Sequence, residues 1–455
     1  MRSRTRINIR GSEMSAMDLD TPWRELVAAR SALAYRMSGG LCMEEVPLVQ
    51  IASSFGTPSY VYGAGTIRAR LADLLGAFRE QGLTPAVRYA VKANDHLAIL
   101  SLLRAGGAGA DVTSAGEMAR ALAAGIMPEA IVFSGVGKRR CEIEMALGHG
   151  IGQINVESAE ELAVLSAIAV SMGKVAPVAL RVNPDVTAGG HDKISTGRAG
   201  DKFGIAFGEA AALYGYAGTL PGIAPVGFST HVGSQIFSPS AFEVAYSRVV
   251  NLIDRLRGEG AVISRLDLGG GFGIPYDSGP VFPMAAYAAM VRRVAGDRCL
   301  DLIVEPGRWL VGPAGVLLTG VTLVKVSVGR KIVILDAGMN DLIRPALYGA
   351  LHGIVPVGMV ASSKPVTITE VVGPVCESSD RFAAACPLPE MAAGELVAIL
   401  DAGAYGAVMS SSYNGRLRAA EVLVDGRGMT LIRKRQELSE LIRDDIVPLG
   451  ERAPA

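Results

Sequence analysis

The sequence predicts an α/β protein in which a closed parallel (β/α)8 barrel is followed by a mostly β domain. Eight short apolar runs between residues 86 and 307 alternate with segments of helical periodicity. Eight β–α units in about 250 residues are what such a barrel needs. After residue 313 the helical patterns give way to strand-like runs separated by turn residues, which predicts the second domain.

The barrel strands are expected where apolar and β-branched residues cluster between turn residues. A segment at 66–82, with apolar residues at helical spacing, precedes the first of them. Helical patterns at 115–125, 159–173 and 240–260 separate later runs. The eight expected strands lie in AVRYAVK (86–92), GADVTS (109–114), AIVFSG (130–135), GQINVES (152–158), PVALRVNP (177–184), PVGFSTHVG (225–233), SRLDLGGG (264–271) and DLIVEPG (301–307).

The chain is expected to divide into four segments. Residues 1–30 are predicted to be a disordered extension, because four arginines precede the first acid and no apolar signal region follows. Residues 31–63 end in the strand-like SYVYG and are predicted to join the β domain. The barrel is predicted at 64–313 and the β domain at 314–455, where it would complete the active site.

The composition gives no reason to expect a macromolecular or membrane partner. The 44 basic residues balance the 44 acidic ones, so a nucleic-acid partner is not expected. No apolar run approaches the roughly 18 residues of a membrane span. Five cysteines without a CxxC pair suggest a reducing, cytoplasmic setting and argue against a metal site. The expected partner is therefore a small molecule.

Lys92 lies at the end of the first expected strand, in RYAVKAN (88–94). One interpretation is a lysine whose stem is covered while its ammonium reaches water. The other is chemical: a desolvated lysine loses its proton more readily and can form a Schiff base with an aldehyde. The lysine alone does not decide between the two interpretations.

Other polar residues gather at the carboxyl ends of the expected strands, the end at which barrels of this kind carry their active sites. The glycines of LDLGGGFGIPY (266–276) can close on a phosphate, although a tight turn is the alternative. Glu305 and Arg308 suit a cationic ring nitrogen and an anion, or else form a structural ion pair. The set at the strand ends is Lys92, Asp111, Ser114, Asn183, His231, Gly270 and Glu305, and Ser234 and Arg308 follow within the same motifs.

A lysine, a glycine loop, an acid, an arginine and a histidine at one barrel end suggest a cofactor that carries an aldehyde and a phosphate. Pyridoxal 5'-phosphate has both groups. Its aldehyde would take the lysine and its phosphate the glycine loop, while an acid would keep its ring nitrogen protonated.

The motif set as a whole resembles diaminopimelate decarboxylases, which are fold-type III pyridoxal-phosphate enzymes with an alanine-racemase-like barrel. The resemblance runs from about residue 40 to residue 440, and YAVKAN and the glycine loop mark only the superfamily. The more specific motifs come later in the chain. They are DAGMNDLIRPALYGA (336–350), VVGPVCESSD (371–380) and DAGAYG (401–406).

The resemblance implies decarboxylation of meso-2,6-diaminopimelate to L-lysine and CO2 by a homodimer with shared active sites. Lys92, His231 and Cys376 would be catalytic, with Lys92 as the Schiff-base lysine, His231 stacked on the ring and Cys376 as the proton donor. Cys376 and Glu377 would come from the partner subunit. The implied cofactor contacts are Lys92, Asp111, His231, Ser234, Gly270, Gly271, Glu305, Gly307, Arg308 and Tyr405. The implied substrate contacts are Arg308, Arg344, Tyr348, Glu377 and Tyr405.

The substrate contacts fit a molecule that carries a carboxylate and an ammonium at its distal end. Arg308 and Arg344 can hold a carboxylate by paired hydrogen bonds, and Glu377 can hold the ammonium. An enzyme for ornithine needs the acid but no distal arginine, so Arg344 favours the diacid. The alternatives are a decarboxylase for ornithine, arginine or carboxynorspermidine, a racemase on the same barrel, and a non-catalytic cofactor-binding relative. Loss of Lys92 or Cys376 would indicate the last, and both are present.

Overall fold

The computed structural model describes residues 22–447 apart from 38, 187–201, 277–278 and 361–363. The chain forms two compact units, which are considered separately. The barrel unit comprises residues 66–275 and 279–313, and the β unit comprises the described parts of residues 1–65, 276–278 and 314–455. In the described ranges, no helix has both the length and the apolar character needed to cross a membrane.

The barrel unit contains the predicted eight parallel strands, so the predicted fold class is confirmed. Each strand pairs with its neighbours in the order β9-β11-β12-β13-β5-β6-β7-β8, and β8 pairs with β9 to close the barrel. A short strand, β10 (Ile205–Ala206), adds to β9. The barrel strands are β5 (Ala86–Ala90), β6 (Gly109–Val112), β7 (Ile131–Phe133), β8 (Gln153–Val156), β9 (Ala176–Asn183), β11 (Ile223–Ser229), β12 (Arg265–Asp267) and β13 (Asp301–Val304).

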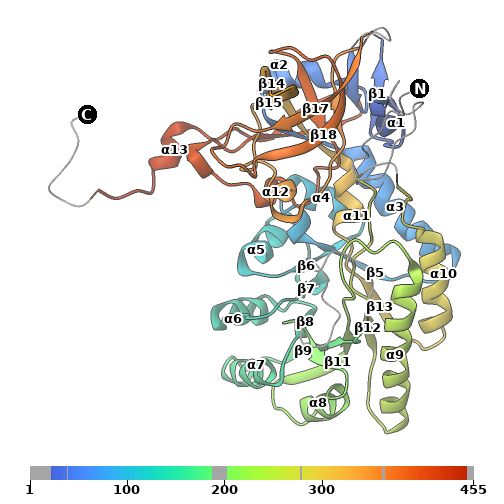
Figure 1. The fold of residues 1–455 in the computed structure, drawn as a ribbon. Coiled ribbons are helices and arrows are strands. Elements are labelled where there is room, and N and C mark those ends of the chain that lie inside the picture. The colour runs from blue at the N-terminus through green and yellow to red at the C-terminus, as the bar shows by residue number, and fades with distance from the viewer. Residues whose placement is uncertain (1–21, 38, 187–201, 277–278, 361–363, 448–455) are drawn as a thin grey trace. The chain divides into compact units, whose positions relative to one another are not determined.

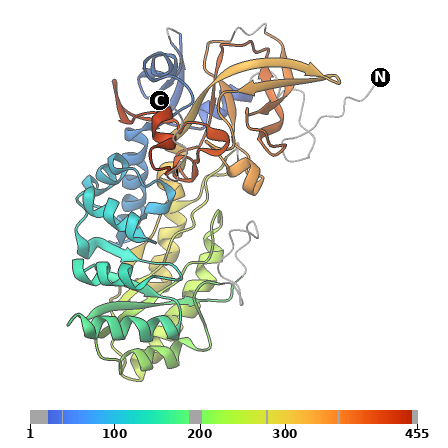
Figure 2. The same ribbon diagram turned by 90° about the vertical axis from the view of Figure 1, so that its left-hand side faces the viewer.

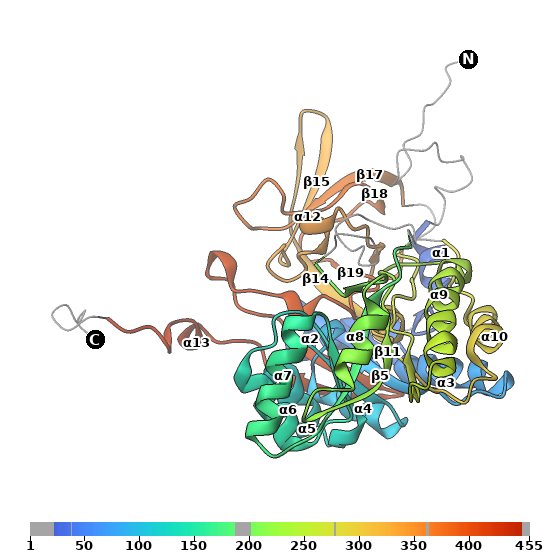
Figure 3. The ribbon, with the colours of Figure 1, turned by 90° about the horizontal axis from the view of Figure 1, so that it is seen from below.

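Helices surround these strands, as Figures 1 and 3 show. Two of them begin with the pattern Ser-x-x-Glu, in which the serine side chain accepts the backbone N–H of the glutamate. Ser114 caps α5 in this way and Ser158 caps α7, which fixes where the chain leaves β6 and β8. The helices are α3 (Ala64–Glu80), α4 (Leu97–Ala105), α5 (Ala115–Ala123), α6 (Arg140–His149), α7 (Ala159–Ser171), α8 (Ala210–Ala217), α9 (Pro239–Gly258), α10 (Met284–Ala295) and α11 (Arg308–Val311).

The β unit is built on a sheet with the path β18-β17-β15-β14-β4-β20-β21, to which β19 and β16 are added beside β14. The N-terminal strand β4 (Ser59–Gly63) lies between β14 and β20, which confirms the predicted N-terminal contribution. Figure 2 shows the β14–β15 hairpin extending beyond the sheet. The other strands are β14 (Gly315–Ser327), β15 (Arg330–Leu335), β16 (Ile354–Pro356), β17 (Val366–Val372), β18 (Arg381–Pro389), β19 (Leu396–Ile399), β20 (Ala420–Asp425) and β21 (Gly428–Arg433).

Three further strands and three short helices belong to the β unit, together with helix α1 (Pro22–Ala28), which is described below. Strands β1, β2 and β3 form a separate antiparallel sheet, in the order of their numbers. The strands are β1 (Leu33–Arg36), β2 (Gly40–Met43) and β3 (Val46–Pro47), and the helices are α2 (Leu48–Phe55), α12 (Arg344–Tyr348) and α13 (Leu438–Ile442).

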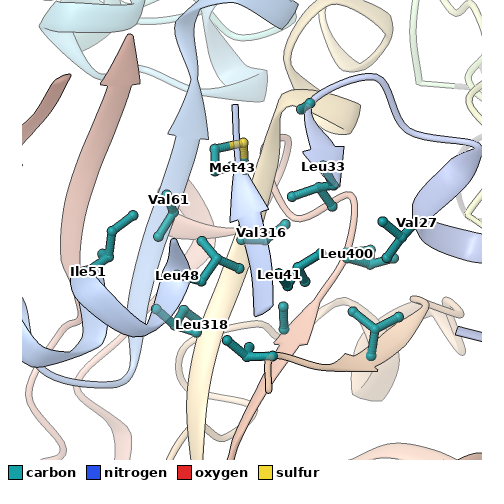
Figure 4. Close-up of a cluster of buried hydrophobic side chains, with 14 of the residues drawn as sticks. Val27, Leu33, Leu41, Met43, Leu48, Ile51, Val61, Val316, Leu318 and Leu400 are labelled. Carbon is teal, nitrogen blue, oxygen red and sulfur yellow. The ribbon is translucent and has the colours of Figure 1, made fainter. Parts of the chain in front are cut away.

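The core of the β unit includes residues that were predicted to belong to the disordered extension at 1–30. Residues 1–21 lie outside the described residues, but residues 22–28 form helix α1 (Pro22–Ala28). Trp23 and Val27 pack into the cluster of apolar side chains drawn in Figure 4. Arg30 donates to the buried Asp401, 371 residues later. Disorder over residues 22–30 is therefore wrong, because distant partners bury a segment whose local pattern is weak.

Candidate active site

Lys92 lies one residue beyond strand β5, in a single helical turn over Val91–Ala93. Its Nζ donates to Oδ2 of Asp111 on the adjacent strand β6 at 2.8 Å. The lysine side chain is 39% exposed and the aspartate is fully buried. Of the two interpretations left open for Lys92, its exposure fits a lysine whose stem is covered and whose amine reaches water, and its role as the Schiff-base lysine stays a prediction.

The glycine loop after β12 packs backbone against backbone. A Cβ on Gly270 would collide with the carbonyl oxygen of Glu305, and one on Gly271 with that of Gly233. Gly271 also has a φ of 106°, a conformation that side chains disfavour. The loop is therefore a tight turn in which backbone packs against backbone, and its contact with a phosphate stays a prediction.

His231 is held by this loop. The backbone N–H of Gly270 donates to its Nδ1 at 3.3 Å, so the ring is an acceptor at that atom. Burial lowers the pKa of His231 well below its usual range, and the positive charges of Arg181 and Lys92 lower it further. The ring is therefore neutral, as stacking on a cationic ring would favour. Because the Gly270 N–H is used here, the loop's donor to an anion would have to be another amide, such as that of Gly271.

Glu305 follows β13 and is 7% exposed. Its backbone N–H donates to the carbonyl of Gly269, which ties it to the glycine loop. Its side chain is hydrogen-bonded to Asp267, the last residue of β12. Burial raises the pKa of Glu305 well above its usual range, and the charges of Asp111 and Asp267 raise it further.

Arg308 begins the short helix α11 and is 9% exposed. Its Nη2 donates to the Oγ of Ser234 at 3.1 Å, so two predicted site residues are in contact. Gly307 lets this turn approach β5, because its missing Cβ would lie 3.1 Å from the Cβ atoms of Ala90 and Ala93. The barrel residues predicted from the sequence therefore converge at one end of one unit.

Two other polar strand-end residues have local structural roles. Ser114 caps helix α5. The Oδ1 of Asn183, at the end of β9, accepts the backbone N–H of Asp185.

Arg344 is the first residue of α12 in the β unit and is 5% exposed. Its guanidinium lies 4.5 Å from the centre of the Tyr276 ring. Its Nη1 is 2.7 Å from Nε2 of His352, and the other ring nitrogen of that histidine lies 2.7 Å from the Leu400 carbonyl. Tyr348 ends the same helix, one turn after Arg344. The half-buried Tyr405 has a φ of 56°, a left-handed backbone that few residues adopt.

Cys376 and Glu377 lie on the exposed loop between β17 and β18. The backbone N–H of Cys376 donates to Oδ1 of Asn414 at 2.9 Å. The hydroxyl of Tyr413 donates to Oε1 of Glu377. The carboxylate of Asp380 accepts the backbone N–H of Val375 and of Met339, both at 2.7 Å. These contacts hold an exposed thiol and an exposed acid in a defined place.

Several residues that support the site were not predicted. Asp267 lies in the motif LDLGGG and Asp380 lies in the motif CESSD. Neither motif shows which group its aspartate contacts. Tyr276 ends the glycine-loop motif and His352 follows the Arg344 motif. The remaining two, Tyr413 and Asn414, lie in a run of polar residues that carries no distinctive signal.

The barrel residues fit pyridoxal phosphate by their chemistry. Oε1 of Glu305 and Oδ1 of Asp111 are buried and have no hydrogen-bond partner among the described residues. A buried acceptor without a donor costs free energy, so a ligand that supplies a donor there is favoured. A ring N–H is such a donor, and the amine of Lys92 lies beside the second acceptor.

Known proteins resemble this chain along most of its length. Residues 64–312 match the family described as "Pyridoxal-dependent decarboxylase, pyridoxal binding domain". A diaminopimelate decarboxylase of Zymomonas mobilis is 46% identical over 411 residues, which cover 90% of this chain and 97% of that protein.

Solved structures agree. The diaminopimelate decarboxylase of Helicobacter pylori in complex with L-lysine has a TM-score of 0.83 and 38% identity, covering 87% of this chain and 98% of that one. The enzyme of M. jannaschii with L-lysine has a TM-score of 0.87 and 35% identity, covering 92% and 98%. The chain therefore belongs to the diaminopimelate decarboxylase family of pyridoxal-phosphate-dependent enzymes.

Proposed function

We propose that this protein removes CO2 from meso-2,6-diaminopimelate and releases L-lysine, the last step of lysine biosynthesis. The observation that carries the proposal is the group formed by Lys92, His231 and Glu305 at the mouth of the barrel. It occurs in a chain whose relatives bear the name diaminopimelate decarboxylase along nearly their whole length. In two related structures the bound molecule is L-lysine, the expected product.

The barrel residues have separate tasks in this proposal. Lys92 would hold the cofactor's aldehyde carbon through its side-chain amine. Glu305 faces the ring nitrogen through its unsatisfied Oε1, and neutral His231 covers a face of the ring. Ser234 and Arg308 form one wall, with Gly271 as the loop's phosphate donor. The bound cofactor supplies an electron sink for the electron pair left behind when CO2 departs.

The β-unit residues would select the substrate. Arg344 is held by Tyr276 and His352, so its guanidinium is already oriented for a carboxylate. Glu377 would take the distal ammonium, while Tyr348 and Tyr405 complete the substrate contacts. An arginine placed for a distal carboxylate favours the diacid over ornithine, which lacks that carboxylate.

Cys376 would return a proton to the carbon that has lost CO2. A thiol suits this task because its usual pKa lies close enough to neutral for it to give and regain a proton. Cys376 and Glu377 are exposed in the single chain, which supports the proposal that they serve the site of a partner subunit. The working unit would be a cytoplasmic homodimer.

The activity is tested by incubating the cofactor-loaded protein with meso-diaminopimelate and measuring L-lysine and CO2. Ornithine and arginine serve as competing substrates in parallel reactions. We expect lysine and CO2 in equal amounts and at least a 100-fold preference for the diacid, since ornithine offers no distal carboxylate to the guanidinium of Arg344. Preferred release of CO2 from ornithine or arginine would contradict the assignment of Arg344.

The shared site is tested by mixing two inactive variants, Lys92→Ala and Cys376→Ala, under conditions in which subunits exchange. Random mixing should restore about a quarter of wild-type activity, because half of the dimers are mixed and each has one intact site. If subunit exchange is demonstrated by mass spectrometry and no activity returns, the cysteine does not act across a dimer interface.

A further inference from the structure

Two buried carboxyl groups share a hydrogen bond at the mouth of the barrel. Asp267 is fully buried and Glu305 is 7% exposed. They lie at the ends of the paired strands β12 and β13, where the Leu268 N–H donates to the carbonyl of Ile303 at 2.9 Å and the Glu305 N–H to that of Gly269 at 2.7 Å. Their side chains are hydrogen-bond partners of each other. Two ionised carboxylates have no hydrogen between them, so this contact requires one proton. The pair thus holds a proton whichever member carries it.

The neighbours of the pair indicate which carboxyl carries the proton in the cofactor-free protein. Oδ1 of Asp267 accepts the backbone N–H of Gly269 at 3.0 Å. Its Oδ2 accepts from the side-chain amides of Gln153 at 3.2 Å and Asn155 at 3.4 Å. Oε1 of Glu305 accepts nothing from the described residues. Donors stabilise the charged form, so Asp267 is the carboxylate and Glu305 is the acid that donates to it.

The surrounding charges maintain this single proton. Burial raises the pKa of Asp267, and the charge of Asp111 raises it further. Lys92 is the nearby cation that favours ionisation of Glu305, but it already pairs with Asp111. The titratable or charged groups that influence the pair from the neighbouring elements are Lys92 and Arg88 around β5, Asp111 on β6, Tyr246 on α9 and Tyr287 on α10.

We propose that Asp267 is a positioning residue that keeps one proton in common with Glu305, both before and after the cofactor binds. When the ring nitrogen carries its own proton, Glu305 must face it as a carboxylate. The proton of Glu305 then passes to Asp267, which donates it back to Glu305 from the other side. No proton is lost from the pair, and the ring proton comes from the cofactor or from water.

This arrangement extends the proposed function, on which it rests, by explaining how a carboxylate remains aligned in a buried site. If Asp267 did not take the proton, Glu305 would have to release it completely. Two negative charges, one on Glu305 and one on Asp267, would then lie side by side in a buried site. The shared proton avoids that repulsion and locks the side chain of Glu305 in one orientation. Neutral Asp267 is therefore the state that matters for the working enzyme.

The test measures the proton directly. Infrared spectroscopy of the full chain detects the C=O stretch of a protonated carboxyl, which we expect at neutral pH both without cofactor and after pyridoxal phosphate is added. The band should be altered by Glu305→Gln, which identifies its source. A matched control is Glu142→Gln, because the pKa of Glu142 is lowered to about 2 and its carboxylate contributes no such band.

Asp267→Asn is the decisive variant, because asparagine has the shape of the neutral acid and can donate N–H to Glu305. Without the cofactor, the pH at which the Glu305 band disappears should fall by about one unit or more, since the negative charge that favours the proton on Glu305 is lost. With the cofactor, Asp267→Asn should keep most of kcat, whereas Asp267→Ala should lose at least 10-fold in kcat with little change in KM.

Two outcomes would overturn the proposal. One is complete loss of the protonated-carboxyl band when the wild-type protein binds pyridoxal phosphate, which would mean that Glu305 gives up its proton alone. The other is an Asp267→Asn protein with the wild-type titration of that band. The wild-type measurement needs no variant to fold and no turnover, so it stands even if the proposed decarboxylation fails its own test.

Discussion

Asp380 is predicted to fix the loop that carries Cys376 and Glu377. Its buried carboxylate accepts two backbone N–H groups from separate segments, those of Met339 and Val375, at 2.7 Å each. A hydrogen bond to a charged group contributes about 1.5–3 kcal/mol, so Asp380→Ala should lower the free energy of unfolding by roughly 3–6 kcal/mol. Asp380→Asn keeps one acceptor oxygen and should lose about half of that.

The same change should lower activity beyond its effect on stability. Because the loop is released, Cys376 would no longer be held at one point, and such misplacement can reduce the rate about 100-fold. Stability is measured by denaturant unfolding, and activity by kcat at saturating substrate. Alkylation of Cys376 is followed by peptide mass spectrometry, because Cys141 and Cys299 are also exposed.

A matched control is Glu390→Gln, which breaks an exposed ion pair with Lys331 at the end of β18. Pairs of this kind contribute little, so its stability and kcat should stay close to those of the wild type. If Asp380→Asn unfolds like the control and leaves both kcat and the alkylation rate of Cys376 unchanged, Asp380 does not position the loop.

Three further outcomes are expected. Burial raises the pKa of Asp341 from 3.8 to about 6, so the folded protein holds that proton more tightly than the unfolded chain. Below pH 3.8 this proton does not limit the stability of the folded protein. As the pH rises from 3.8 through 6, the proton is lost and the free energy of unfolding falls by about 3 kcal/mol. Denaturant titrations at a series of pH values should show that the free energy of unfolding of Asp341→Asn does not fall in this way. If the wild type and the variant lose stability in parallel over this pH range, the assignment is contradicted. Tyr413→Phe removes the hydroxyl that holds Glu377 and should raise KM about 3- to 10-fold with kcat nearly unchanged in steady-state assays. Lys92→Ala should abolish turnover and the absorbance of lysine-bound cofactor while circular dichroism stays unchanged; decarboxylation at the wild-type rate would refute its role.

The barrel could be predicted from the sequence because each of its strands and helices is signalled by residues that are close together in the chain. Each strand is a short apolar run between turn residues, and each is followed by a helical pattern with its own capping signal, such as Ser158 before Glu161. Parallel strands bring their carboxyl ends to one side, so Lys92, His231 and Glu305 were grouped correctly by position alone.

The rest depends on contacts between distant residues, which no local pattern reveals. Trp23 and Val27 of helix α1 are buried by apolar side chains far along the chain, such as Leu400, and Arg30 just after the helix donates to Asp401. Asp267 lies in the glycine-loop motif, but its proposed role depends on the carboxyl group of Glu305, which follows a different strand. The exposure of Lys92 likewise depends on how Asp111 and the turn after β5 meet, so the sequence alone could not decide between its two interpretations.

The position of β4 has a consequence for synthesis on the ribosome. This strand leaves the ribosome before the barrel, yet one of its two neighbours, β20, spans residues 420–425. For most of translation β4 therefore has an open edge, and the barrel is complete before that edge can close. An exposed strand edge invites pairing with other chains. A polypeptide that stops before residue 420 should thus contain a finished barrel and still aggregate, and deleting β4 along with the C-terminal segment should keep it dispersed.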